Sequence, residues 1–213
     1  AICPIIDKGP TNEHILPVFL KLLRDESSEV RLNLFKRLED LNEVIGIEDL
    51  QQSILPSLSE LAKKELAHQV VGRRVVPVLA RQLGEHFFNE KLNPICLSWL
   101  KDPVFTIREA AINNVKQLTI IFGPQWASKN LFPKLFALQT ESNYLHRLTP
   151  LFAMQHVACV LPAELIKRQL LPVISQMQMD KVANIRMNVA KVGGAFASAV
   201  KGQPDVEVSD CVT

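Results

Sequence analysis

The side chains best suited to covalent chemistry in this chain are four cysteines and five histidines. One pair, His156 and Cys159, lies three residues apart, which would place both side chains on one face of a helix. A cysteine nucleophile needs a histidine base and a third group that orients the base, and the sequence around this pair offers no such group. The remaining histidines fall at unrelated positions: His14, His68, His86 and His146. The sequence therefore predicts no catalytic residues.

Metal and cofactor motifs are also missing from the sequence. The histidines form no HExxH spacing, and the cysteines form no CxxC spacing. There is no GxGxxG, P-loop or GxSxG sequence. Adjacent carboxylates such as Glu39 and Asp40 would point apart on a helix and are typical of a solvated face. We expect no metal, no cofactor, no small-molecule substrate and no enzymatic activity. An enzyme of unknown type is therefore the weakest hypothesis for the function of this chain.

The composition excludes further classes of function. The chain has 24 Lys and Arg against 22 Asp and Glu, so its net charge of +2 gives no basic surface for nucleic acid. No apolar run approaches the roughly 20 residues that a membrane helix needs. The wide spacing of the cysteines favours reduced thiols in a cytoplasmic or nuclear protein. The first residue is Ala1 and no signal peptide is evident, so we expect a fragment or a processed product.

Charged residues that recur at regular spacing could make ion pairs. Four acidic residues are each followed six positions later by an arginine: Asp25 and Arg31, Asp102 and Arg108, Glu141 and Arg147, Asp180 and Arg186. Each acid could accept hydrogen bonds from free N–H groups at the start of the next helix. Each arginine could reach the acid of the neighbouring unit. We favour such a row over local exposed pairs, which contribute only about 0–1 kcal/mol.

These charges recur because the whole chain is periodic. Its marker prolines are Pro17, Pro56, Pro94, Pro133 and Pro172, at spacings of 39, 38, 39 and 39 residues. A period of this length is typical of a chain built from one repeated supersecondary unit. Between the prolines, apolar residues follow the helical period over Val30–Ile45 and Ile107–Phe122. Each unit is therefore predicted to be a pair of helices.

The ends and bends of these helices can be predicted from glycine and proline. Gly46, Gly84 and Gly123 close three units at the same phase and are expected to be C-caps. The marker proline falls inside the first helix of a unit, for example within the segment from Glu48 to Leu61, and should bend it. Near the end of the chain, Gly193-Gly194 is expected to interrupt the last helix.

Two-helix units of about 39 residues, with proline in the first helix and Asp-x5-Arg at the start of the second, resemble HEAT repeats. Several runs further resemble the family of scaffolding (A) subunits of protein phosphatase 2A, in its C-terminal portion, over about residues 1–191. The runs are Glu43-Val44-Ile45-Gly46-Ile47, Glu90-Lys91-Leu92-Asn93, Ile107-Arg108-Glu109-Ala110-Ala111, Asn143-Tyr144-Leu145-His146-Arg147 and Val182-Ala183-Asn184-Ile185-Arg186. The expected fold is an all-α solenoid of about five repeats.

The repeat spacing places the boundaries of the units. They are expected near residues 11–46, 48–84, 88–123, 127–161 and 163–200, preceded by part of a repeat at 1–10. Residues 201–213 are polar, contain Pro204 and show no period, so they are expected to form a disordered tail.

The resemblance implies a non-catalytic scaffold. It would hold the Ser/Thr phosphatase catalytic subunit through the turns between paired helices and help assemble the holoenzyme, with a regulatory B-type subunit bound in the full-length assembly. Carried over to this chain, the turn ridge consists of His68, Val104, Phe105, Asn143, Tyr144, Val182 and Ala183. Large exposed side chains at turn tips suit such a surface.

The second unit departs from the family pattern. It is one residue short, and Lys64 and Val70 replace the acid and the arginine. Ala67-His68-Gln69 stands where the family has a basic–Trp–Arg turn, which could remove an anchor of binding. The alternative hypothesis is a HEAT-repeat transport or adaptor module that binds other proteins. Such modules tend to be strongly acidic, and this chain is not.

Overall fold

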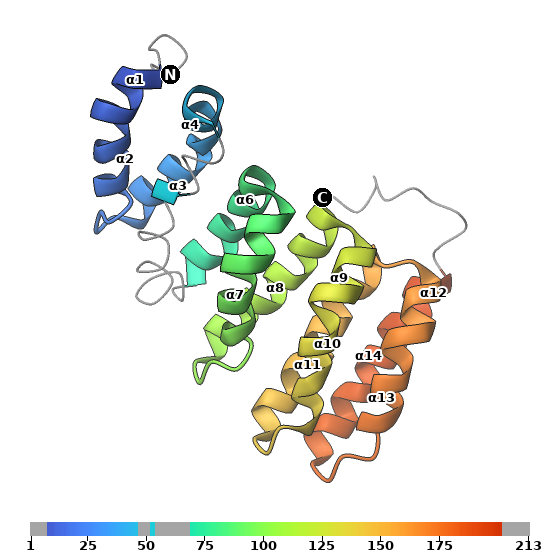
Figure 1. Cartoon of the computed structure of the whole chain (residues 1–213). Coiled ribbons are helices and arrows are strands. Elements are labelled where there is room, and N and C mark those ends of the chain that lie inside the picture. Colours follow the sequence, from blue (N-terminus) through green and yellow to red (C-terminus); the bar gives the residue numbers. More distant parts are fainter. Residues whose placement is uncertain (1–7, 47–51, 54–68, 202–213) are drawn as a thin grey trace. The chain divides into compact units, whose positions relative to one another are not determined.

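The computed structural model describes residues 8–46, 52–53 and 69–201, and every regular element in these ranges is helical (Figure 1). The chain divides into two compact units, residues 1–95 and 96–213, with the boundary inside α7 (Asn93–Trp99). This helical structure confirms the predicted all-α fold class. Within the described ranges, no helix is both long and apolar enough to cross a membrane.

In the first unit, a helical hairpin packs against a further long helix. Its helices are α1 (Lys8–Pro10), a π-helical turn at Thr11–Ile15, α2 (Leu16–Leu22), α3 (Ser28–Lys36), α4 (Leu38–Ile45), α6 (Gln69–Phe87) and a π-helical turn at Phe88–Leu92. Helix α2 contacts α3, and α3 contacts α6. The interior is formed by apolar residues at helical spacing, including Phe19, Leu23, Phe35, Leu41 and Leu79. Burial of this apolar surface is the main force that holds the unit together.

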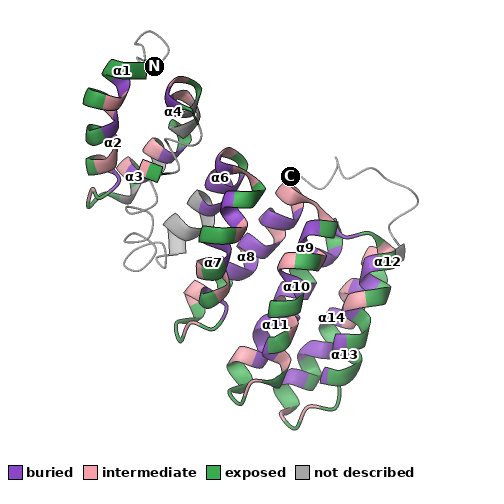
Figure 2. Cartoon of the chain, in the orientation of Figure 1, coloured by how far each residue is buried: buried purple, intermediate pink, exposed green. Residues whose placement is uncertain are grey.

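In the second unit, successive helix pairs lie side by side. Its helices are α8 (Phe105–Phe122), α9 (Pro124–Asn130), α10 (Phe132–Phe136), a 3₁₀ turn at Ala137–Thr140, α11 (Tyr144–Val157), a 3₁₀ turn at Ala158–Val160, α12 (Ala163–Leu165), a π-helical turn at Ile166–Leu170, α13 (Leu171–Met177) and α14 (Ala183–Lys201). Helix α11 contacts both α8 and α14, as Figure 1 shows. Leu151, Ala153 and Met154 of α11 are fully buried, and Figure 2 shows buried segments on the packed helices of this unit.

The marker prolines distort the first helix of each described repeat. A π-helical turn immediately precedes three of the Leu-Pro or Asn-Pro pairs: Thr11–Ile15 before Pro17, Phe88–Leu92 before Pro94, and Ile166–Leu170 before Pro172. Before Pro133 the helix breaks at Leu131, with φ −104°. Proline has no N–H and its ring clashes with the carbonyl one turn earlier, and a widened or broken turn relieves both problems.

Gly46 and Gly123 end their helices as predicted, and Gly84 interrupts α6 with a non-helical kink (φ 79°, ψ 170°). Gly46, Gly84 and Gly123 have φ values of 86°, 79° and 90°. Only glycine adopts this region without a steric cost, because it has no Cβ. Gly123 ends α8 and begins α9, and its N–H donates to the Thr119 carbonyl at 3.0 Å. The reversal between the two helices of neighbouring repeats is therefore encoded in one residue.

Two expectations about helix continuity are wrong. The predicted helix over 30–45 is two helices, α3 and α4, because Arg37 leaves the helical region at φ −96°, ψ 6°. Conversely, α14 continues through Gly193-Gly194 to Lys201. Val192 and Phe196 on either side of the glycines are buried. Packing of α14 against α11 and α13 thus offsets a cost of about 1 kcal/mol per glycine.

Part of the predicted repeat organisation lies outside the described residues. This includes the start of the chain, most of the first helix of the unit at 48–84 with Pro56, and the tail apart from Lys201. Of the segment from Glu48 to Leu61, the structure describes Gln52 and Ser53, which are helical. The repeat boundaries therefore stay a prediction.

Candidate protein-binding site

The turns between paired helices share one hydrogen-bonding scheme. In three of them, the carboxylate of the aspartate accepts the backbone N–H two residues later at 2.8 Å: Asp25 from Ser27, Asp102 from Val104, and Asp180 from Val182. In the fourth, Asn143 accepts the N–H of Leu145 at 3.0 Å and caps α11. Each turn is thus closed by a short polar side chain at the start of the second helix.

The arginine six residues after each acid closes the same turn from the other side. Arg108 Nη1 donates to the Asp102 and Pro103 carbonyls at 2.7 and 2.9 Å. Arg147 Nη1 makes the equivalent bonds to Glu141 and Ser142 at 2.8 and 2.9 Å. The corresponding bonds elsewhere join Arg31 to the Asp25 and Glu26 carbonyls, and Arg186 to the Asp180 carbonyl. The fixed Asp-x5-Arg spacing therefore serves the turn of its own repeat.

One of these arginines also reaches the next repeat. Arg147 Nε and Nη2 donate to the two carboxylate oxygens of Asp180 at 2.7 and 3.0 Å. The side chains of Arg147 and Asp180 are only 7% and 11% exposed. These two hydrogen bonds lower the pKa of Asp180 and raise the pKa of Arg147. The pair is a bidentate, partly desolvated link between two repeats.

Between the two preceding repeats, a different ion pair occupies the position that corresponds to Arg147 and Asp180. Glu141 lies at the phase of Asp180, one repeat earlier, and accepts a hydrogen bond from Lys101 Nζ at 2.5 Å. This bond lowers the pKa of Glu141. Lys101 and Glu141 are 52% and 31% exposed, so solvent screens their attraction. The expected contact of an arginine with the acid of the next repeat is thus present for Arg147 and Asp180, whereas Lys101 contacts Glu141 in the place that the sequence assigned to Arg108.

The expected ridge residues lie at the tips of these turns. Phe105 is 55% exposed and Tyr144 is 40% exposed, and Val104 beside Phe105 is also exposed. The guanidinium of Arg108 lies 5.7 Å from the centre of the Phe105 ring, close enough for a cation–π interaction. Val182 is half-buried and Ala183 is exposed. His68 lies outside the described residues.

Three exposed apolar residues next to the turns were missed in the sequence reasoning. They are Leu145, Met179 and Met187. The register could have indicated them, because Leu145 follows Tyr144 and Met179 directly precedes the acidic residue of its turn. Phe105, Leu145 and the two methionines therefore extend the apolar surface along the second unit's turns.

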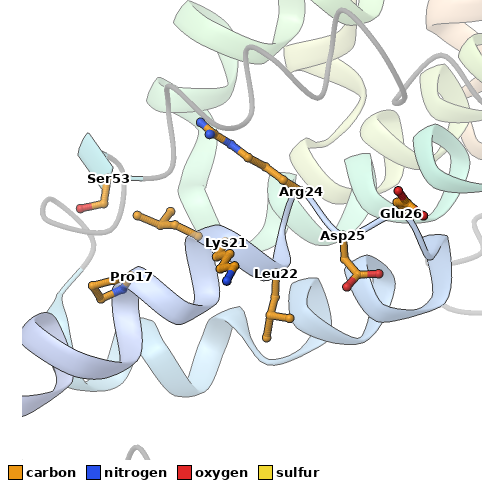
Figure 3. Close-up of a pocket in the computed structure, with 8 residues that line it drawn as sticks. Pro17, Lys21, Leu22, Arg24, Asp25, Glu26 and Ser53 are labelled. Atoms are coloured by element: carbon orange, nitrogen blue, oxygen red, sulfur yellow. The ribbon is translucent and has the colours of Figure 1, made fainter.

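A pocket in the first unit lies beside α2 and the turn that follows it (Figure 3). Its lining combines Pro17 and Leu20 with charges of both signs, among them Lys21 and Asp25. Asp25 already accepts a hydrogen bond from its own turn. The lining contains no histidine or cysteine, and the described residues contain no group of three or more potential metal ligands.

His156 and Cys159 are linked by a hydrogen bond from the Cys159 thiol to the His156 carbonyl at 3.5 Å.

Stacked helix pairs with distorted first helices and glycine-capped ends define an α-solenoid, and residues 15–45 match the family model of the HEAT repeat. This segment of the chain is therefore similar to a HEAT repeat. Over part of its length the chain is similar to the A-type regulatory subunits of protein phosphatase PP2A from several organisms. This agrees with the resemblance seen in the sequence.

The relatives match over limited stretches. The A-type PP2A regulatory subunit of Schizosaccharomyces pombe is 47% identical over 65 residues, which are 30% of this chain and 11% of that protein. Its counterpart in Saccharomyces cerevisiae is 43% identical over 88 residues, 40% of this chain and 13% of that protein. The beta isoform of the human 65 kDa A-type regulatory subunit is 45% identical over 114 residues, 50% of this chain and 19% of that protein. The chain thus spans a minor part of each relative's length.

Among solved structures, a designed armadillo repeat protein in complex with the peptide (KR)4 aligns with a TM-score of 0.42 at 16% identity. The alignment covers 89% of this chain and 87% of the designed protein. This score is too low to establish a shared fold.

Proposed function

We propose that this chain is a non-catalytic scaffold that holds the catalytic subunit of protein phosphatase 2A and so helps assemble the holoenzyme. The observation that carries the proposal is the pair of exposed aromatic residues, Phe105 and Tyr144, at the same phase of two successive turns. The similarity to A-type regulatory subunits of PP2A supports the choice of partner. In a longer assembly, a regulatory B-type subunit would bind to other repeats.

The chemistry of the turns suits this role. Aromatic side chains that project from a rigid support provide much of the binding energy at protein interfaces. Here each turn is held in place by a buried arginine. Arg108 and Arg147 donate hydrogen bonds of 2.7–2.9 Å to the carbonyls of their turns. A turn that is already ordered loses little conformational entropy when a partner binds.

Binding can be measured directly with the purified PP2A catalytic subunit. The variant Phe105→Ala/Tyr144→Ala should bind at least tenfold more weakly than the unmodified chain, because a single hot-spot truncation costs about 2 kcal/mol or more. Val18→Ala/Leu171→Ala is a matched control, since it truncates two exposed apolar residues that lie on α2 and α13 away from the turn tips. This control should bind normally.

The possible results separate the two parts of the proposal. Equal binding by the aromatic variant and the unmodified chain would reject Phe105 and Tyr144 as anchors. If the unmodified chain shows no binding to the catalytic subunit, the scaffold function itself is rejected for these repeats.

We also propose that the protein works in the cytoplasm or the nucleus. The wide spacing of the four cysteines along the sequence, with no CxxC pair, supports a reducing compartment. Fluorescence microscopy of a tagged chain would test this location, and accumulation in the secretory pathway would contradict it.

A further inference from the structure

Two exposed methionine side chains that the scaffold proposal does not use lie in the turn between α13 and α14 and near the start of α14. Met179 is 83% exposed and Met187, on α14, is 53% exposed. Met179 directly precedes Asp180, and Met187 directly follows Arg186. Arg186 Nη1 donates a hydrogen bond to the Asp180 carbonyl at 2.7 Å. Methionine is flexible and polarizable, so it adapts to irregular apolar surfaces and is common at protein contacts.

The charge around these methionines is positive. Lys181 and Arg186 are exposed. The nearby acidic group, Asp180, is held by Arg147 and is largely removed from solvent. Between residues 176 and 191 no other acidic residue occurs, whereas Lys191 adds a further exposed positive charge. The last described turn therefore presents apolar sulfur atoms within a basic surface, which complements a segment with apolar and acidic side chains.

We propose that Met179 and Met187 bind an apolar, acidic segment of the phosphatase catalytic subunit, and that a peroxide weakens this contact by oxidising the two thioethers. This inference rests on the proposed function and assigns a mode of regulation to the same surface. In the reaction, each sulfur attacks one peroxide oxygen and the O–O bond breaks. The sulfur loses two electrons and becomes a sulfoxide, while hydrogen peroxide is reduced to water.

The consequence for binding follows from the change in polarity. A thioether loses little hydration energy when a partner covers it, whereas a sulfoxide oxygen is a strong hydrogen-bond acceptor that an apolar partner leaves unsatisfied. Both oxidised side chains remain well hydrated in the free chain, because Met179 and Met187 are exposed. Oxidation therefore destabilises the complex without unfolding the scaffold.

The structure provides an internal control for the oxidation itself. The other two methionines, Met154 and Met177, are buried. After brief treatment of the folded chain with hydrogen peroxide, peptide mass spectrometry should find sulfoxide at Met179 and Met187 and little at the buried pair. Equal oxidation of all four methionines would contradict the exposure on which the inference rests.

Affinity for the catalytic subunit should be measured before and after peroxide treatment, with the oxidant removed. The unmodified chain should bind about tenfold more weakly after oxidation. Met179→Leu/Met187→Leu keeps the apolar surface but removes both sulfurs, so peroxide treatment should not change its affinity. Met179→Gln/Met187→Gln should bind weakly without any oxidant.

Cysteine oxidation is separated from methionine oxidation by the means of reversal. A thiol reductant reverses cysteine disulfides and sulfenic acids but leaves methionine sulfoxide in place, whereas methionine sulfoxide reductases restore the thioether. Recovery of binding with the reductases supports the proposal, and recovery with a thiol reductant alone overturns it. A loss of binding by the leucine variant after peroxide also overturns it.

The acidic character of the partner segment has its own test. At low salt, Lys181→Gln should slow association with the catalytic subunit, and it should reduce the salt dependence of the association rate. Unchanged association would overturn the electrostatic part. If the untreated, unmodified chain does not bind the catalytic subunit, the proposed function fails and this inference fails with it. Unaltered binding after complete oxidation of Met179 and Met187 would overturn this inference alone.

Discussion

The link between Arg147 and Asp180 makes the sharpest prediction about stability. Replacing Asp180 by alanine removes the acceptor of both inter-repeat hydrogen bonds, 2.7 and 3.0 Å long, and the acceptor of the Val182 N–H. The Arg147 guanidinium then stays in a site where its side chain is 7% exposed, without its carboxylate. An uncompensated buried charge is strongly unfavourable, so the variant should be less stable.

The size of this effect can be worked out from the contacts that remain. Removing one partner of a buried ion pair costs about 3–5 kcal/mol. Arg147 Nη1 still donates to the Glu141 and Ser142 carbonyls, so the guanidinium keeps part of its solvation. We therefore expect the lower end, about 3 kcal/mol. Arg147→Met/Asp180→Leu removes both charges, together with the turn bonds of Arg147, and should lose less stability than the sum of the two single substitutions.

Because a repeat protein can unfold in parts, the assay should have a local readout. Hydrogen exchange of the α13–α14 turn, followed by mass spectrometry, would report the opening of this joint, and a urea titration would report the overall stability. Glu141→Ala is the matched control, since Glu141 has the same phase but pairs with the more exposed Lys101. This control should leave the urea midpoint nearly unchanged.

The pH dependence of the effect has a definite sign. Because the pKa of Asp180 is lowered in the folded chain, its contribution is complete above the unfolded value of about 3.9. The contribution is lost as the pH falls through the lower folded pKa. The difference between the unmodified chain and Asp180→Ala should therefore shrink below about pH 4. Equal stabilities at pH 7, or equal effects of Asp180→Ala and Glu141→Ala, would refute the reasoning.

Three further predictions concern two glycines and the cysteines. Gly123→Ala should destabilise the chain by about 1–3 kcal/mol in urea, because its φ of +90° strains any residue with a Cβ. Gly194→Ala, inside α14 and with open space at the Cβ position, should instead stabilise it by about 0.5–1 kcal/mol. Burial raises the pKa of Cys96 to about 12, so a maleimide at pH 7 should label exposed Cys159 and spare Cys96 in the folded chain. Labelling of both at equal rates would contradict this.

Local features of the fold could be read from the sequence with good accuracy. The end of α8 at Phe122 follows from Gly123, whereas the helical period predicted a start at Ile107, two residues after the observed start at Phe105. The positions of the marker prolines correctly indicated where the first helices are distorted. Proline lacks a backbone N–H, and this affects only the helical turn next to Pro17, Pro94 and Pro172. These predictions succeeded because the cause lies within a few residues of the effect.

Predictions that depended on packing were less successful. The sequence could place Glu141 and Asp180 at the same phase, but it could not choose Lys101 for one and Arg147 for the other. It also overestimated the effect of Gly193-Gly194, because the buried neighbours Val192 and Phe196 hold α14 against other helices. Exposure of Met179 was not considered at all.

The amino-acid sequence by itself determined the repeat length, the helix pairs and the turns, because backbone sterics and short-range hydrogen bonds act over one or two helical turns. The tertiary structure decided which charges meet across a joint and which apolar side chains stay in solvent. Both outcomes depend on atoms that are brought together from neighbouring repeats, as for Arg147 and Asp180, which are 33 residues apart in the sequence. Their energies depend on how far neighbouring helices exclude water, and that is a property of the packed repeats.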